Sequence, residues 1–236
     1  MLKNCAIKKI IVSCLLIYSF DIFAVSLNLI IPINSIGNGK SDTLRLKDFC
    51  RDLLENVSHS YLNLIDLAYD PKSNRQFEME VVDLFVSECG YKGLHLGGGR
   101  KPDGIIYTEN LEENYGTIID TKSYSKGYSL PISQADEMRR YVEENNKRDV
   151  KINPNKWWNN FPDLLNKFSF LFVSSEFNGQ FEEKLENIAQ STKINGGALN
   201  VVNLLILAEN IKSNFMDMEQ VYKLITQNSE IKLIDA

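Results

Sequence analysis

The residues with the clearest capacity for chemistry lie at the ends of two short apolar runs. Asp103 opens the run 103–108, and Asp120 and Lys122 close the run 115–122. A polar, turn-prone segment separates the runs, so we predict an antiparallel hairpin. Because side chains alternate between the faces of a strand, Asp120 and Lys122 project from the same face, roughly 7 Å apart at ~3.3 Å per residue. Two carboxylates and an amine can therefore converge.

These side chains suit metal-assisted hydrolysis of a phosphodiester. Two carboxylates held close together in a partly dry site repel each other, and without a counter-ion one would stay protonated. Mg²⁺ removes that penalty, keeps positions for water and a phosphate oxygen, and acidifies the bound water. Lys122 would orient this water or stabilise the developing negative charge. An ion pair of Asp120 and Lys122 at an exposed strand end is the alternative, but charges at the end of an apolar strand are costly without a purpose.

The elements that must position this hairpin alternate between helical and strand patterns. Periodicity predicts helices at 44–54, 62–68, 77–89, 131–146, 179–191, 203–211 and 216–226, and strands at 168–173 and 196–201. This order predicts an α/β fold with a mixed β-sheet flanked by helices. Trp157 and Trp158 are expected to pack in the core or at its rim rather than to stack on bases.

Composition limits the possible partners. The 236 residues are 44% hydrophobic and 24% charged, as in an ordinary globular protein, and the net charge of −5 creates no global field that attracts nucleic acid. A nucleic-acid surface must therefore be local, and a candidate basic patch consists of Lys92, His95, Arg100 and Lys101. The four cysteines (Cys5, Cys14, Cys50 and Cys89) form no C-x-x-C pair, which indicates a reducing compartment without a disulfide framework.

The N-terminal segment, 1–43, differs from the rest of the chain. Three lysines precede an apolar run at 10–20, which is the layout of a secretory signal peptide. The run is too short to span a bilayer. Alternation after Val25 favours instead a strand from an upstream module, and 34–42 has the composition of a linker. We therefore divide the chain into an apolar segment with a linker, 1–43, and one domain, 44–236.

Longer strings around the hairpin resemble a known family. HLGGGRKPDG, GTIIDTKSYSKGYSLPISQADEMRRYVEEN and INPNKWW closely resemble the cleavage domain of FokI and related type IIS restriction endonucleases of the PD-(D/E)xK superfamily. The resemblance extends from about Leu44 to about residue 232 and implies a restriction-endonuclease-like α/β/α fold. It implies that Asp103 and Asp120 bind a catalytic Mg²⁺, for which Mn²⁺ substitutes, with the carbonyl of Thr121 as a further ligand. Lys122 would be the catalytic lysine.

The same resemblance assigns a second task to the helix after the hairpin. In enzymes like FokI one cleavage domain cuts one strand, and two domains pair through this helix to break double-stranded DNA. Asp136 and Arg140 match the family's interface pair, which implies a transient homodimer on DNA. Spaced i, i+4, they could instead pair within one exposed helix. Ile152 is a further apolar residue expected at the interface.

Two features leave alternatives open. Glu78 lies on a helix where relatives in the superfamily often place an acid, but a solvated helix residue is an equal alternative, so it is left out of the predicted site. FokI-like enzymes also carry a large sequence-reading module ahead of the cleavage domain, where this chain has 1–43. A separate recognition chain would supply specificity, or the gene is split or truncated, or cleavage has no sequence preference.

We therefore expect a Mg²⁺-dependent DNA endonuclease of a restriction system, with low intrinsic sequence specificity and no membrane partner. The expected location is the cytoplasm, and export through the N-terminal segment is a minor alternative. A non-catalytic DNA-holding or dimerisation subunit is the other class of function considered. The intact pattern of Asp103, Asp120 and Lys122 argues against it.

Overall fold

The computed structural model describes residues 40–109 and 114–234. Predictions for 1–39, among them the signal-like segment, Cys5 and Cys14, lie outside these ranges. Within them the elements follow in this order: α2 (Lys40–Leu53), η1 (His59–Leu62), α3 (Asn63–Tyr69), η2 (Pro71–Ser73), α4 (Asn74–Ser87), β1 (Lys92–His95), β2 (Gly104–Tyr107), β3 (Tyr115–Lys122), α5 (Ile132–Lys147), η3 (Trp157–Asn160), β4 (Lys167–Ser174), α6 (Phe181–Thr192), β5 (Gly196–Asn200), α7 (Val201–Lys212) and α8 (Met218–Ile225).

The described strands form one mixed sheet in the order β1-β2-β3-β4-β5. Short connections make the pairs β1–β2 and β2–β3 antiparallel. The pairs β3–β4 and β4–β5 are parallel, and α5 and α6 lie in the long crossover connections that parallel neighbours need. The predicted hairpin and the mixed α/β sheet are therefore confirmed.

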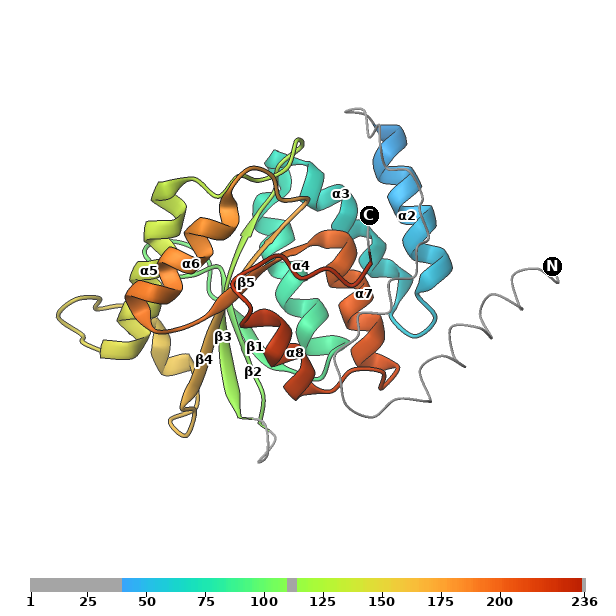
Figure 1. Cartoon of the computed structure of the whole chain (residues 1–236). Coiled ribbons are helices and arrows are strands. Elements are labelled where there is room, and N and C mark those ends of the chain that lie inside the picture. Colours follow the sequence, from blue (N-terminus) through green and yellow to red (C-terminus); the bar gives the residue numbers. More distant parts are fainter. Residues whose placement is uncertain (1–39, 110–113, 235–236) are drawn as a thin grey trace. The chain divides into compact units, whose positions relative to one another are not determined.

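Helices cover both faces of the sheet (Figure 1). The face toward α4 and α7 forms one core with α2, α3 and α8, and the face toward α5 and α6 forms the other. The inner strand β3 contributes to both, because Ile119 packs on the α4 side and Ile118 on the α5 side. Trp157 and Trp158 are buried in the α5-side core, which confirms their predicted packing.

Local chemistry explains where the element boundaries differ from the predictions. The strand β1 was missed because four residues with a central glycine carry almost no periodic signal; a Cβ on Gly93 would lie 2.7 Å from the carbonyl oxygen of Ile105. The predicted strand 196–201 ends one residue earlier, since the Asn200 side chain accepts a hydrogen bond from the Asn203 amide and caps α7. The predicted linker, 34–42, is wrong at its end, because α2 begins at Lys40.

Two cysteines within the described ranges are free and buried, Cys50 and Cys89. Burial raises the pKa of Cys50 to about 12, so this thiol stays protonated and unreactive near neutrality. No helix among the described residues has both the length and the apolar character needed to cross a membrane.

Candidate active site

The predicted residues meet where β2 begins and β3 ends. The register pairs Gly104 with Ile119, so Asp103, one residue before β2, lies beside Asp120. Since side chains two residues apart share a face, both aspartates project toward the α5 side, as do Ile105 and Ile118 of that core. The hairpin geometry therefore brings the two carboxylates together.

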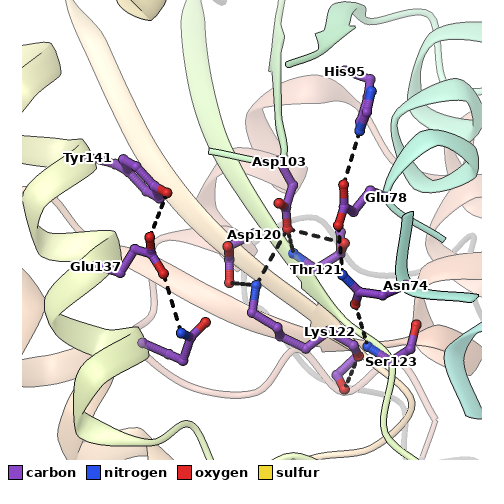
Figure 2. Close-up of polar contacts among 12 residues, drawn as sticks. Asn74, Glu78, His95, Asp103, Asp120, Thr121, Lys122, Ser123, Glu137 and Tyr141 are labelled. Atoms are coloured by element: carbon purple, nitrogen blue, oxygen red, sulfur yellow. Dashed lines mark hydrogen bonds and ion pairs between the residues drawn. The ribbon is translucent and has the colours of Figure 1, made fainter. Parts of the chain in front are cut away.

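Lys122 joins the two aspartates (Figure 2). Its Nζ lies 2.8 Å from Oδ2 of Asp120 and 3.6 Å from Oδ2 of Asp103, and the three side chains are 7–18% exposed. The backbone amide of Thr121 donates a hydrogen bond of 2.8 Å to Oδ2 of Asp103, which fixes that carboxylate against β3. The structure thus gathers the predicted catalytic residues in a nearly dry cluster, while the role of the Thr121 carbonyl stays a prediction.

Burial dominates the electrostatics of this cluster. It is the main reason why the pKa of Asp120 rises to about 7; the ion pair with Lys122 opposes the rise, and the charges of Asp103 and Glu137 add to it. Burial alone would lower the pKa of Lys122, but the charges of Asp120 and Asp103 outweigh it, and this pKa lies above its ordinary value. The amine therefore stays protonated near neutrality.

The donor set fits a hard divalent cation with few protein ligands. Oδ2 of Asp120 is buried, and its close contact is the ion pair with Lys122 at 2.8 Å. One lysine offsets the charge of two carboxylates incompletely, which leaves a negative, oxygen-lined spot. Within 40–109 and 114–234 no group of three acidic, histidine or cysteine side chains gathers in a way that could hold a metal ion.

Glu78 is not a solvated helix residue; that alternative is wrong. Its side chain is buried and accepts hydrogen bonds from Nδ2 of Asn74 at 2.7 Å and Nε2 of His95 at 3.1 Å. Asn74 in turn accepts from the amide of Ser123, directly after Lys122. His95 itself ends β1. The i, i+4 spacing of Asn74 and Glu78 on α4 was the available signal.

Glu137 is a residue near the site that sequence reasoning missed. It extends from α5, and its carboxylate accepts hydrogen bonds from the hydroxyl of Tyr141 at 2.9 Å and from Gln134 at 3.3 Å (Figure 2). Its charge contributes to the raised pKa of Asp120. The register of α5 against β3 decides this proximity, and that register is a tertiary feature without a local sequence signal.

The two predicted interface residues do not pair with each other. Asp136 forms an ion pair with Arg139 at 2.9 Å, and Arg140 lies 3.1 Å from Glu137. The intrahelical pair of Asp136 and Arg140 is therefore wrong for this structure. Near them Ile132 is 72% exposed, beside a groove of about 420 Å³ between α5 and α6. Ile152, which follows α5 in the sequence, is 43% exposed.

A mixed sheet between two helical layers, with two aspartates and a lysine at the β2–β3 edge, defines a domain of the restriction-endonuclease fold. The chain belongs to the family of FokI cleavage domains, since the family model "FokI, cleavage domain" matches residues 40–232.

Named relatives agree with this assignment. The chain is 47% identical over 182 residues to the type II restriction enzyme FokI of Planomicrobium okeanokoites and 38% identical over 190 residues to the type II restriction enzyme StsI of Streptococcus sanguinis. These alignments cover 77% and 79% of this chain but only 31% of each relative. Solved structures of FokI, alone and bound to DNA, match with a TM-score of 0.79 at 45% identity, over 82% of this chain and 34% of those chains.

Proposed function

We propose that the protein is a Mg²⁺-dependent DNA endonuclease of a restriction system, with its nuclease domain at 44–236. The observation that carries this proposal is the buried convergence of Asp103, Asp120 and Lys122. The two named relatives are type II restriction enzymes, and one matching FokI structure is a complex with DNA, which supports duplex DNA as the substrate.

Each residue of the cluster has a distinct task in this mechanism. Asp103, held by the Thr121 amide, and Asp120 would bind the divalent ion together with the Thr121 carbonyl. When bound, Mg²⁺ or Mn²⁺ supplies a Lewis acid and an acidified water. Lys122, kept protonated by the two carboxylates, would orient the attacking water and stabilise the negative charge that develops on the phosphate.

Double-strand cleavage would require two copies of the chain. Asp136 and Arg140, with Ile152, would form a two-fold interface between two domains on DNA, each cutting one strand. Both charged residues already have partners within their own helix, so dimerisation exchanges ion pairs and gains little energy from them. We therefore expect a monomer in dilute solution. We further propose that a separate chain supplies sequence recognition and that the protein is located in the cytoplasm.

The other class of function, a non-catalytic DNA-holding or dimerisation subunit, needs no intact cluster. A subunit of this kind would tolerate loss of Lys122 or of either aspartate, whereas here the three side chains lie together in contact. Their persistence favours catalysis.

Plasmid cleavage tests the proposal. The purified chain should nick supercoiled plasmid in Mg²⁺ and stop when EDTA is added. Asp120→Asn and Lys122→Ala should lower the rate by about 10²-fold or more. Asp163→Asn, which changes a fully exposed aspartate, is the matched control and should cut as the wild type does. If the wild type nicks no faster than Asp120→Asn, the chain is not a nuclease of this kind.

A further inference from the structure

A further buried carboxylate lies near the end of α5. The side chain of Glu144 is 1% exposed, and its Oε2 accepts hydrogen bonds of 2.8 Å from Asn153 Nδ2 and from Trp157 Nε1. Its Oε1 receives no hydrogen bond from the described residues and lies 3.8 Å from Nε of Arg140 and 4.0 Å from Arg100. A buried charge is costly unless it is paired, so this position calls for an explanation.

The segment that follows α5 is hydrogen-bonded to the backbone of the glycine-rich loop, 97–101. The same Nδ2 of Asn153 that binds Glu144 also donates to the carbonyl oxygen of Arg100 at 2.9 Å. Nδ2 of Asn155 donates to the carbonyl oxygen of Gly99 at 3.0 Å. The backbone of the loop is thus bonded to residues about 50 positions further along the chain.

The loop needs this support because its backbone is strained. Gly97, Gly98, Gly99 and Arg100 have consecutive positive φ angles of 40°, 78°, 38° and 59°. Glycine adopts such angles freely, but Arg100 does not, and a strained residue persists only where its surroundings hold it. The guanidinium of Arg100 donates to the carbonyl oxygen of Ile152 at 3.3 Å, which adds a third contact with the same segment.

Asp103 follows this loop, separated from it by Pro102 alone. Its carbonyl oxygen accepts hydrogen bonds from the amides of Leu96 at 2.8 Å and Gly97 at 3.3 Å, so the base of the loop and Asp103 form one bonded unit. Pro102 restricts the backbone between Arg100 and Asp103. A displacement of Arg100 is therefore passed on to the aspartate.

We propose that Glu144 is a positioning residue for the nuclease centre. Through Asn153 it fixes the segment after α5, and through that segment the loop that sets the place of Asp103. This inference rests on the proposed function. The helix α5 therefore has two roles. It carries the expected interface residue Arg140, and through Glu144 and Asn153 it is hydrogen-bonded to the loop before Asp103. The competing explanation is that Glu144 only stabilises the segment after α5.

Two variants of the full-length chain separate these explanations. Glu144→Gln removes the charge but keeps an acceptor, and Asn155→Ala removes one exposed link to the loop without disturbing the core. Their controls are Glu143→Gln, a half-exposed neighbour on α5, and Asn159→Ala, an exposed asparagine outside the loop contacts.

The readouts are the single-turnover cleavage rate at saturating plasmid, DNA affinity with Ca²⁺ in place of Mg²⁺, and amide hydrogen exchange at Leu96 and Gly97. We expect Glu144→Gln to lower the rate about tenfold and Asn155→Ala about threefold, because small displacements of a catalytic group slow the reaction. DNA affinity should stay unchanged, and exchange at both amides should accelerate. The controls should match the wild type.

The inference is overturned if rate and exchange stay at wild-type values in both variants, even if Glu144→Gln lowers the melting temperature. Should Glu144→Gln not fold, Asn155→Ala still tests whether the segment after α5 holds the loop, and wild-type rate and exchange in that variant overturn the inference. If the wild type does not cut DNA, the proposed function fails, and exchange at Leu96 and Gly97 still shows whether Glu144 holds the loop.

Discussion

The chain places charged residues of the same kinds in two settings, inside the β2–β3 edge and on the surface of α5. At the edge Asp120 and Lys122 are 7% and 18% exposed, and the strand register fixes their positions. On α5 Asp136 and Arg139 are 54% and 46% exposed and form an ion pair on the helix surface. The buried cluster is electrostatically perturbed, whereas the surface pairs can exchange partners at little cost.

Removal of the lysine should give the largest difference between the two settings. Lys122→Met leaves two carboxylates close together without their cation, so we expect a loss of about 3 kcal/mol in the free energy of unfolding without divalent ions, together with loss of nicking. The matched change on α5, Arg139→Met, should cost less than about 1 kcal/mol, since an exposed ion pair contributes little. Urea denaturation in EDTA measures both; similar losses for the two variants would contradict the contrast.

The raised pKa of Asp120 predicts a pH dependence. Its carboxyl titrates near pH 7 in the folded chain and near 4 when unfolded, so between these values only the folded state holds the proton. Stability must then fall as pH rises from about 4 to about 7, because the folded state binds more protons there. Asp120→Asn should lack this fall and, in EDTA, be more stable than the wild type at pH 7.

Thermal unfolding between pH 4 and pH 8 measures this difference. Asp163→Asn, which alters a fully exposed aspartate, should follow the wild-type curve. Parallel curves for the wild type and Asp120→Asn would show that the carboxyl is not held in a perturbed environment. Mg²⁺ should stabilise the wild type, and Asp120→Asn should lose that gain.

A charge reversal on α5 should affect two-strand cleavage only. Asp136→Arg places like charges across the expected two-fold interface, and we expect double-strand cleavage to fall about tenfold, which corresponds to about 1.4 kcal/mol of association free energy. Nicking by single copies should persist. The order of double-strand cleavage in protein concentration checks the cause: wild-type linearisation should rise more steeply than nicking. Equal losses of both activities would place Asp136 in the catalytic machinery instead.

The two settings also explain what could be predicted from the sequence. The hairpin and its two aspartates are local: an apolar run, a polar turn and alternation suffice to place Asp103 beside Asp120. Apart from Asn74, one helical turn before Glu78, the partners of Glu78 and Glu144 are not local, because His95, Asn153 and Trp157 reach them only through packing of separate elements. The residue type of a helical glutamate does not show whether its side chain is buried or exposed, so the environment of these carboxylates could not be predicted from the sequence.

Glu78 is buried but lies outside the catalytic cluster, so its substitution should have the smallest effect on cleavage of the variants considered. It is buried like Asp120, yet its carboxylate accepts hydrogen bonds from Asn74 and His95 on the α4 side rather than from the residues of the catalytic cluster. Glu78→Gln keeps an acceptor for Asn74, so we expect a loss of about 1 kcal/mol in stability and a cleavage rate within a few-fold of wild type. Plasmid nicking across a Mg²⁺ series decides its class. A loss above tenfold that excess Mg²⁺ restores would place Glu78 among the metal-binding carboxylates, because only a residue that affects ion affinity can be compensated by mass action.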